Sequence, residues 1–120
     1  MDKYKKEELV EALQVVYSTI RNCEKIHPKF AEGTSQHTLL KNRIKAMYIS
    51  KSLITDNIMD KYTKEELEAA IPPVASVISK CEKAKLKAVE GTSNHTRLKK
   101  MIKAMYVSKS LITNEISKRD

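Results

Sequence analysis

Two short polar stretches carry the residue types best suited to binding an anion. The sequence reads EGTSQHT at positions 32–38 and EGTSNHT at positions 90–96. In each stretch a glycine, which would let a ligand approach the backbone closely, is followed by hydroxyl side chains and a histidine. Each stretch also precedes a predicted helix, whose free backbone N–H groups and positive dipole end favour phosphate-sized anions. Simple helix capping beside solubilising lysines also explains the pattern, so both interpretations stay open.

The sequence shows no side chains arranged for catalysis or for holding a metal. The acidic pairs Glu7-Glu8 and Glu65-Glu66 stand at predicted helix starts, where they complement the helix dipole, and Glu24 and Glu82 are predicted to be lone. Each cysteine lies mid-helix and its histidine lies beyond the following turn, so no pair has the close spacing of a zinc site. The sequence therefore predicts a protein that is not an enzyme and needs no metal or cofactor.

Length and composition define a small, basic, helix-rich chain. It has 120 residues with only 2 glycines and 3 prolines, and this scarcity of turn-forming residues predicts few, long helices. A formal net charge of +8 favours anionic partners, namely nucleic acid, an anionic membrane or phosphorylated small molecules, although lysines that only solvate the surface give the same charge. No long apolar run and no signal-like start is present, so we expect a cytoplasmic protein that does not span a membrane. Cys23 and Cys81 are expected to be buried, reduced thiols.

The chain is an internal duplication. Shifted by 58 residues it matches itself without a gap, with 35 identities in the 58 pairs that align residues 2–59 with 60–117. The two copies, residues 1–58 and 59–120, are each predicted to form two helices joined by a short turn, which must pack antiparallel as a hairpin. The predicted fold is therefore all-α: two tandem helical hairpins that form either one four-helix bundle or a helical oligomer with other chains.

Apolar residues recur every three or four positions along each predicted helix and mark the face that should be buried. In the first helix of each copy these positions are Leu9, Leu13, Val16, Ile20 and Cys23, then Leu67, Ile71, Val74, Ile78 and Cys81. In the second helix they are Leu40, Ile44, Met47 and Ile54, then Leu98, Ile102, Met105 and Ile112. Thr63 and Glu66 form a predicted capping box, whereas copy one has Lys5 at the cap position, so Asp2 is an alternative cap.

Copy two departs from copy one inside its first predicted helix. Pro72-Pro73 replaces Gln14-Val15. Because proline removes a helix hydrogen bond and clashes with the preceding turn, we predict a break or kink near residues 71–73. The first helix of copy one should instead run unbroken to about His27-Pro28.

Each copy has the same order of features: a tyrosine segment, a helix, a Gly-Thr-Ser turn and a second helix, which in copy one reads HTLLKNRIKAMYISKSLI. This order resembles the helical hairpin domain of phage anti-CBASS and anti-Thoeris sponge proteins. Such proteins are small oligomeric binders that sequester cyclic di- or trinucleotides, or cyclised ADP-ribose derivatives, without cleaving them. The resemblance covers one hairpin and applies twice here, across most of the chain. This chain departs from the family in fusing two hairpins, which suggests that a homodimeric hairpin pair has become a single chain.

The resemblance implies a set of ligand-binding residues. Helix-start side chains would meet phosphates, and a tyrosine near the start of each copy would stack on a base. The set comprises Tyr4, Gly33, Thr34, Ser35, His37, Thr38, Arg43, Tyr62, Gly91, Thr92, Ser93, His95, Thr96 and Arg97. Arg43 becomes Met101 in copy two, where Arg97 lies one turn nearer the helix start, so a guanidinium contact would be relocated there.

The resemblance therefore implies a phage-encoded anti-defence sponge in the cytoplasm of the infected bacterial host. It would bind a cyclic nucleotide or cyclic ADP-ribose-type signal, form a homo-oligomer and make no membrane contact. Two alternatives remain. One is a non-catalytic helical protein-interaction module. The other is a small basic nucleic-acid-binding protein, which the scatter of lysines around the helices disfavours, because such binding needs a continuous basic face.

Overall fold

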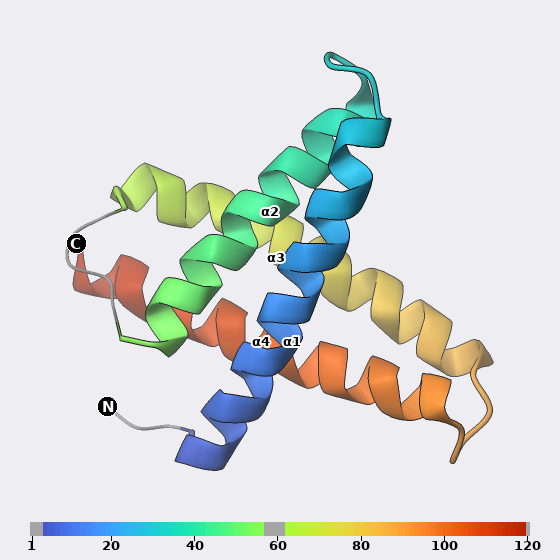
Figure 1. Cartoon of the computed structure of the whole chain (residues 1–120). Coiled ribbons are helices and arrows are strands. Elements are labelled where there is room, and N and C mark those ends of the chain that lie inside the picture. Colours follow the sequence, from blue (N-terminus) through green and yellow to red (C-terminus); the bar gives the residue numbers. More distant parts are fainter. Residues whose placement is uncertain (1–3, 57–61, 120) are drawn as a thin grey trace.

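The computed structural model describes residues 4–56 and 62–119, and four helices make up most of this part (Figure 1). They are α1 (Lys6–Ile26), α2 (Ser35–Ile54), α3 (Lys64–Lys87) and α4 (Ser93–Lys118), and a short 3-10 turn, η1 (His27–Lys29), follows α1. The described residues contain no strand. The predicted all-α fold is confirmed in its four-helix bundle form.

Local sequence explains where the helices begin. Thr34, Thr63 and Thr92 are the N-caps of α2, α3 and α4, and each hydroxyl accepts a hydrogen bond from a backbone N–H one turn ahead. The predicted capping box of α3 is present, since Glu66 also accepts from the Thr63 N–H at 2.9 Å. α1 begins after Lys5, whose backbone N–H donates to the Glu8 carboxylate at 2.9 Å. The alternative cap, Asp2, lies outside the described residues.

One hydrophobic core spans all four helices. Every apolar position predicted from the sequence periodicity is buried or half-buried. From the first hairpin the core takes Ala12, Val16, Ile20, Ala46, Met47 and Ile49. From the second it takes Leu67, Ala70, Val74, Val77, Ile78, Ala104, Met105, Val107 and Ile112. Because both copies supply core residues, neither hairpin buries its apolar face alone.

The two hairpins cross one another (Figure 1). α1 packs on α4, α2 packs on α3, and the second helices α2 and α4 also touch, whereas α1 and α3 make no contact in the described residues. The buried positions of α2 and α4 include the small residues Ala46, Ser50, Ala104 and Ser108. Small buried side chains of this kind let packed helices approach closely.

Ion pairs between the hairpins follow the duplication. Lys45 of α2 pairs with Glu66 of α3 at 2.9 Å, and Lys103 of α4 pairs with Glu8 of α1 at 2.9 Å. These residues are equivalent under the 58-residue shift. The two copies are therefore related by an approximate twofold arrangement, in which each first helix faces the second helix of the other copy.

Of the predicted break or kink at the proline pair, the break is wrong. α3 is a single helix from Lys64 to Lys87 with Pro72 and Pro73 inside it. Residues on both sides of the prolines are buried in the same core, including Ala70 before them and Val74 directly after them. Tertiary packing on each side thus holds the helix through the lost hydrogen bonds. The prediction for α1 is confirmed, because it ends at Ile26, just before His27-Pro28.

Both cysteines are free thiols, as expected, but their burial differs. Cys23 is buried, whereas Cys81 is only half-buried. Burial raises the pKa of each thiol. The Arg43 guanidinium opposes that increase at Cys23, and Arg97 followed by Arg43 opposes it at Cys81. None of the helices in the described part of the chain has the length and apolar character needed to cross a membrane.

Candidate functional site

The two predicted helix starts lie at the tips of the hairpins, far apart in the molecule (Figure 1). Thr34 donates to the Ala31 carbonyl at 2.7 Å and accepts from the His37 N–H at 3.2 Å. Thr92 likewise donates to the Val89 carbonyl at 2.6 Å and accepts from the His95 N–H at 3.3 Å. Both hydroxyls are therefore committed to local capping. Ser35, Thr38, Ser93 and Thr96 lie exposed on the first helical turns.

The tip glycines adopt a left-handed backbone and leave open space beside them. Gly33 has φ +91° and Gly91 has φ +88°, and a Cβ built on either would meet no atom within 4 Å. A ligand could therefore reach the backbone at each tip. The tips differ in their histidines, because His37 stacks on His27 with ring centroids 4.0 Å apart. Position 85, the equivalent of His27, is a lysine, so His95 has no such stack.

The predicted arginines lie in different environments. Arg43 is half-buried, and its Nε and Nη2 atoms are buried without a hydrogen-bond partner in the described residues. It lies beside Cys23, as its influence on the pKa of that thiol indicates. Arg97 is exposed and donates to the Asn94 Oδ1 at 2.9 Å. The two copies therefore differ in the position of their arginine: the Arg43 guanidinium is half-buried, and the Arg97 guanidinium lies on the surface.

The predicted tyrosines do not join the helix starts within this chain. Tyr4 and Tyr62 pack on the edge of the core just before α1 and α3 begin. α1 is 21 residues long, which corresponds to roughly 30 Å between Tyr4 and the tip that carries Gly33. The structure therefore brings Gly33, Thr34 and His37 together at one tip, and leaves the stacking aromatics at the opposite end.

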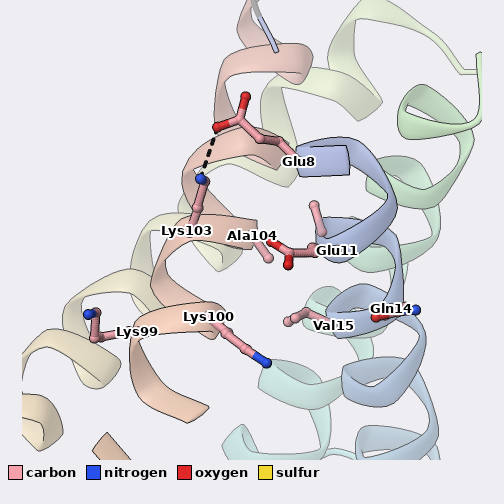
Figure 2. Close-up of a pocket in the computed structure, with 9 residues that line it drawn as sticks. Glu8, Glu11, Gln14, Val15, Lys99, Lys100, Lys103 and Ala104 are labelled. Atoms are coloured by element: carbon pink, nitrogen blue, oxygen red, sulfur yellow. Dashed lines mark ion pairs between the residues drawn. The ribbon is translucent and has the colours of Figure 1, made fainter. Parts of the chain in front are cut away.

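A pocket that the sequence did not predict lies between α1 and α4 (Figure 2). Its volume is about 230 Å³. Its apolar surface comes from Ala12 and Val15 of α1 and Ala104 of α4, where short side chains leave room between the helices. Its polar lining comprises Glu8, Glu11, Gln14, Lys99, Lys100 and Lys103. The pocket therefore combines an apolar floor with a charged rim.

Three lysines and two glutamates line this pocket, but Lys99 lies on the side of α4 away from α1 (Figure 2). Lys103 and Glu8 form the ion pair already described, which closes one end (Figure 2). The Lys103 ammonium and then the Lys5 backbone N–H lower the pKa of Glu8 from its ordinary value of 4.5, and Glu8 in turn raises the pKa of Lys103. Lys100 extends from α4 toward α1 and has no ion-pair partner among the described residues. It is the cation best placed to meet a ligand.

Sequence reasoning missed this pocket because its two walls come from different copies. Its lining residues in α1 and α4 are about 90 positions apart in the sequence, and only the crossed packing of the hairpins brings them together. The available signal was charge complementarity. Glu8 and Lys103 are equivalent to Glu66 and Lys45, but the sequence alone does not say whether each glutamate pairs within its own hairpin or with the other one.

Glu24 and Glu82 each accept a hydrogen bond that the sequence did not predict. The Tyr48 hydroxyl donates to the Glu24 carboxylate at 2.8 Å, and the Tyr106 hydroxyl donates to Glu82 at 3.2 Å. Each bond joins the two helices of one hairpin and raises the pKa of its tyrosine. These duplicated tyrosines are partly exposed, but their retention is explained by this link between helices.

Comparisons with protein-family models, with curated proteins and with solved structures found no match to this chain. No group of three or more histidine, cysteine or acidic side chains suited to holding a metal ion occurs in residues 4–56 and 62–119. The site must therefore be interpreted from its own geometry, in which the α1–α4 pocket and the two helix starts are the candidates for ligand binding.

Proposed function

We propose that this protein binds and sequesters a small nucleotide signal without converting it. The specific form of the proposal is a phage-encoded anti-defence sponge in the cytoplasm of the infected bacterial host. Its ligand would be a cyclic oligonucleotide or a cyclised ADP-ribose derivative. The resemblance of the repeated hairpin to sponge proteins motivates this form, and the pocket between α1 and α4 supplies the physical support.

The observation that carries the proposal is the chemistry of the pocket lining. A nucleotide unit has a flat, largely apolar face, polar ring edges and an anionic phosphate. The pocket offers an apolar floor at Val15 and the two alanines, an acceptor at Glu11, and an ammonium at Lys100 (Figure 2). Ligand sites in general combine apolar walls with a few convergent polar groups, so this lining fits a nucleotide better than a purely apolar or purely ionic ligand.

The size of the pocket limits what it encloses. At about 230 Å³ it is smaller than a typical small-molecule site, which spans roughly 300–1,000 Å³. It would hold one nucleotide unit and leave the rest of a cyclic signal outside. A second chain in a homo-oligomer would cover that remainder, in keeping with the oligomeric state that the resemblance implies.

The test is a thermal-unfolding scan against cyclic dinucleotides, cyclic trinucleotides and cyclic ADP-ribose isomers, with short DNA as the control. A ligand that binds only the folded state adds about 2.7 kcal/mol at a hundred times its dissociation constant, which raises the melting temperature measurably. Ligand recovered after denaturation should be chemically unchanged. Binding followed by a cleaved product would contradict sequestration, and no shift with any cyclic signal would contradict the sponge.

A second candidate function is a protein-interaction module. The observation that favours it is the second hairpin tip, where Leu86 is 88% exposed and Val89 is 71% exposed. Their equivalents in copy one are Pro28 and Ala31, so copy one has no leucine or valine at these two positions. This function predicts no small-molecule shift in the scan, and a change in molar mass on mixing with a partner that Leu86→Lys abolishes.

A further inference from the structure

We propose that each chain holds one nucleotide unit, in the α1–α4 pocket, and that the equivalent surface between α2 and α3 does not bind. This inference rests on the proposed function and deepens it, because it assigns the site, the contacts and the number of ligands per chain. It also gives a role to the proline pair of copy two, which the fold alone does not explain.

The two surfaces share one framework. Lys103 and Glu8 border the α1–α4 pocket, and Lys45 and Glu66 form the same ion pair between α2 and α3, both at 2.9 Å. The duplication therefore built two comparable surfaces between the hairpins. Five of the nine lining positions of the pocket are identical in the two copies. They are Glu8 and Glu66, Ala12 and Ala70, Lys99 and Lys41, Lys103 and Lys45, and Ala104 and Ala46.

The other four positions lack, on the α2–α3 side, the side chains that line the pocket. On the α2–α3 side, Asn42 replaces Lys100, Ala69 replaces Glu11, and Pro72-Pro73 replaces Gln14-Val15. The replacements remove an ammonium, a carboxylate and a side-chain amide, and they put two rings where a polar and an aliphatic side chain stood. The α2–α3 surface still has Lys41, and it still has Lys45, whose ammonium is paired with Glu66.

Figure 2 indicates how the retained pocket would hold its ligand. Lys100 extends toward α1, whereas Lys99 lies on the side of α4 away from α1. The phosphate is therefore assigned to Lys100, the ring to the floor beside Val15, and the ring or ribose N–H and O–H donors to Glu11. Charge-assisted hydrogen bonds are the strongest polar contacts available, so Lys100 should dominate the affinity.

The experiment is an amide NMR titration of the full chain with 5′-AMP as the probe, with adenosine in parallel. We expect shifts confined to residues 11–15 and 99–104, one AMP per chain, and weaker binding of adenosine. Lys100→Asn should weaken AMP binding at least about tenfold. This variant installs the residue that α2 carries at the equivalent place, so it is compatible with the fold. Lys83→Asn, an exposed lysine of α3 outside the pocket, is the matched control and should bind as the parent does.

A graft of the pocket onto the other surface completes the test. A variant with Asn42→Lys, Ala69→Glu, Pro72→Gln and Pro73→Val should gain a second AMP site, with new shifts at residues 41–46 and 69–73. A graft that still binds one AMP would contradict the role given to these replacements. The inference would be overturned by any of three results with the parent chain. These are two AMP sites of equal affinity, amide shifts centred on the helix starts, and no AMP binding.

These outcomes separate the inference from the proposed function. Binding of a cyclic signal at the hairpin tips, unaffected by Lys100→Asn, would refute this site and leave the sponge standing. AMP binding at the pocket, with no response to any cyclic signal, would refute the sponge and leave a nucleotide site.

Discussion

At the scale of single residues, the hairpin tips depend on glycine for its conformation and not for its size. Gly33 has φ +91° and a Cβ there would meet no atom within 4 Å, so a substitution would cost only backbone strain. We expect Gly33→Ala to lower the free energy of unfolding by about 1–2 kcal/mol, measured by urea denaturation. Gly33→Asn should cost less, because asparagine tolerates left-handed backbone better than alanine does. Equal stability of the alanine variant and the parent would contradict this explanation.

Two glutamates at helix starts predict a loss of stability in acid. Hydrogen bonds and the facing lysines lower the pKa of Glu8, chiefly through Lys103, and of Glu66, chiefly through the Thr63 backbone N–H. A carboxylate whose pKa is lower in the folded state stabilises the fold above its ordinary pKa of 4.5, and this contribution is lost as the pH falls through the folded value.

We therefore expect the melting temperature to decrease as the pH falls below about 4.5, and the decrease should be smaller in Glu8→Gln and Glu66→Gln. Glu68→Gln, which changes an exposed glutamate on the same helix as Glu66, is the control and should leave the pH profile as it is. Identical profiles for all three variants would show that the two helix-start carboxylates are not the source of the acid sensitivity.

The sequence predicted residue roles that depend on neighbours in the chain and missed those that depend on distant ones. The cap Thr63 was identified because an N-cap bonds to a backbone N–H only two or three residues ahead. The acceptor role of Glu24 was missed because its partner, Tyr48, is 24 positions away on another helix.

At the scale of elements, α3 is the helix whose sequence and structure conflict. Pro73 lies inside the helix and lacks the N–H that would bond to the preceding turn. Pro73→Val, which copies the residue of α1, restores this donor. We expect it to raise the free energy of unfolding by about 1–3 kcal/mol, measured by urea denaturation. The gain falls short of the full proline penalty, because proline also restricts the unfolded chain.

A matched control for this variant is Pro28→Ala, since Pro28 lies in η1, after α1 has ended. There the proline does not interrupt an α-helix, so its replacement should not stabilise the protein. If Pro73→Val were neutral or destabilising, the packing of the proline ring would have to compensate for the lost hydrogen bond.

The positions of the helices could be predicted from the apolar periodicity of the sequence, but the continuity of α3 through its prolines could not. The four helices were expected because apolar residues repeat at helical spacing in both copies, and each expected position is buried or half-buried. The break was expected from the local preference of Pro72 and Pro73 alone. It is absent because Leu67, Ala70 and Val74 anchor α3 on both sides, and local preference does not include that packing.

At the scale of the whole molecule, the duplication predicted two hairpins but not how they cross. Periodicity marks which face of a helix is buried, but it does not say which helix of the other copy covers that face. The pairing of α1 with α4 is a property of both copies together, and the α1–α4 pocket exists only through that pairing. The candidate site at the hairpin tips could be predicted because it is local, and the pocket could not.

The crossed arrangement predicts that neither copy folds as a monomer. Met47 and Met105 have no exposed surface, and the core that buries them includes residues of both hairpins. A chain of about 60 residues buries only roughly 60% of the surface that its unfolded form exposes, and a lone two-helix hairpin has no second layer to cover its apolar face. We expect residues 1–58 alone to be largely unfolded, or dimeric at high concentration, as measured by circular dichroism and sedimentation.

Mixing residues 1–58 with residues 59–120 should restore helicity at a one-to-one ratio, because the two hairpins then supply each other's missing layer. Met47→Ala in the full chain should lower the free energy of unfolding by about 2–5 kcal/mol, and it should also weaken the association of the two fragments. Lys83→Asn, at an exposed site of α3, should change neither quantity. A stable, monomeric, helical 1–58 fragment would show that one hairpin is sufficient, and that the shared core followed the duplication without being needed for folding.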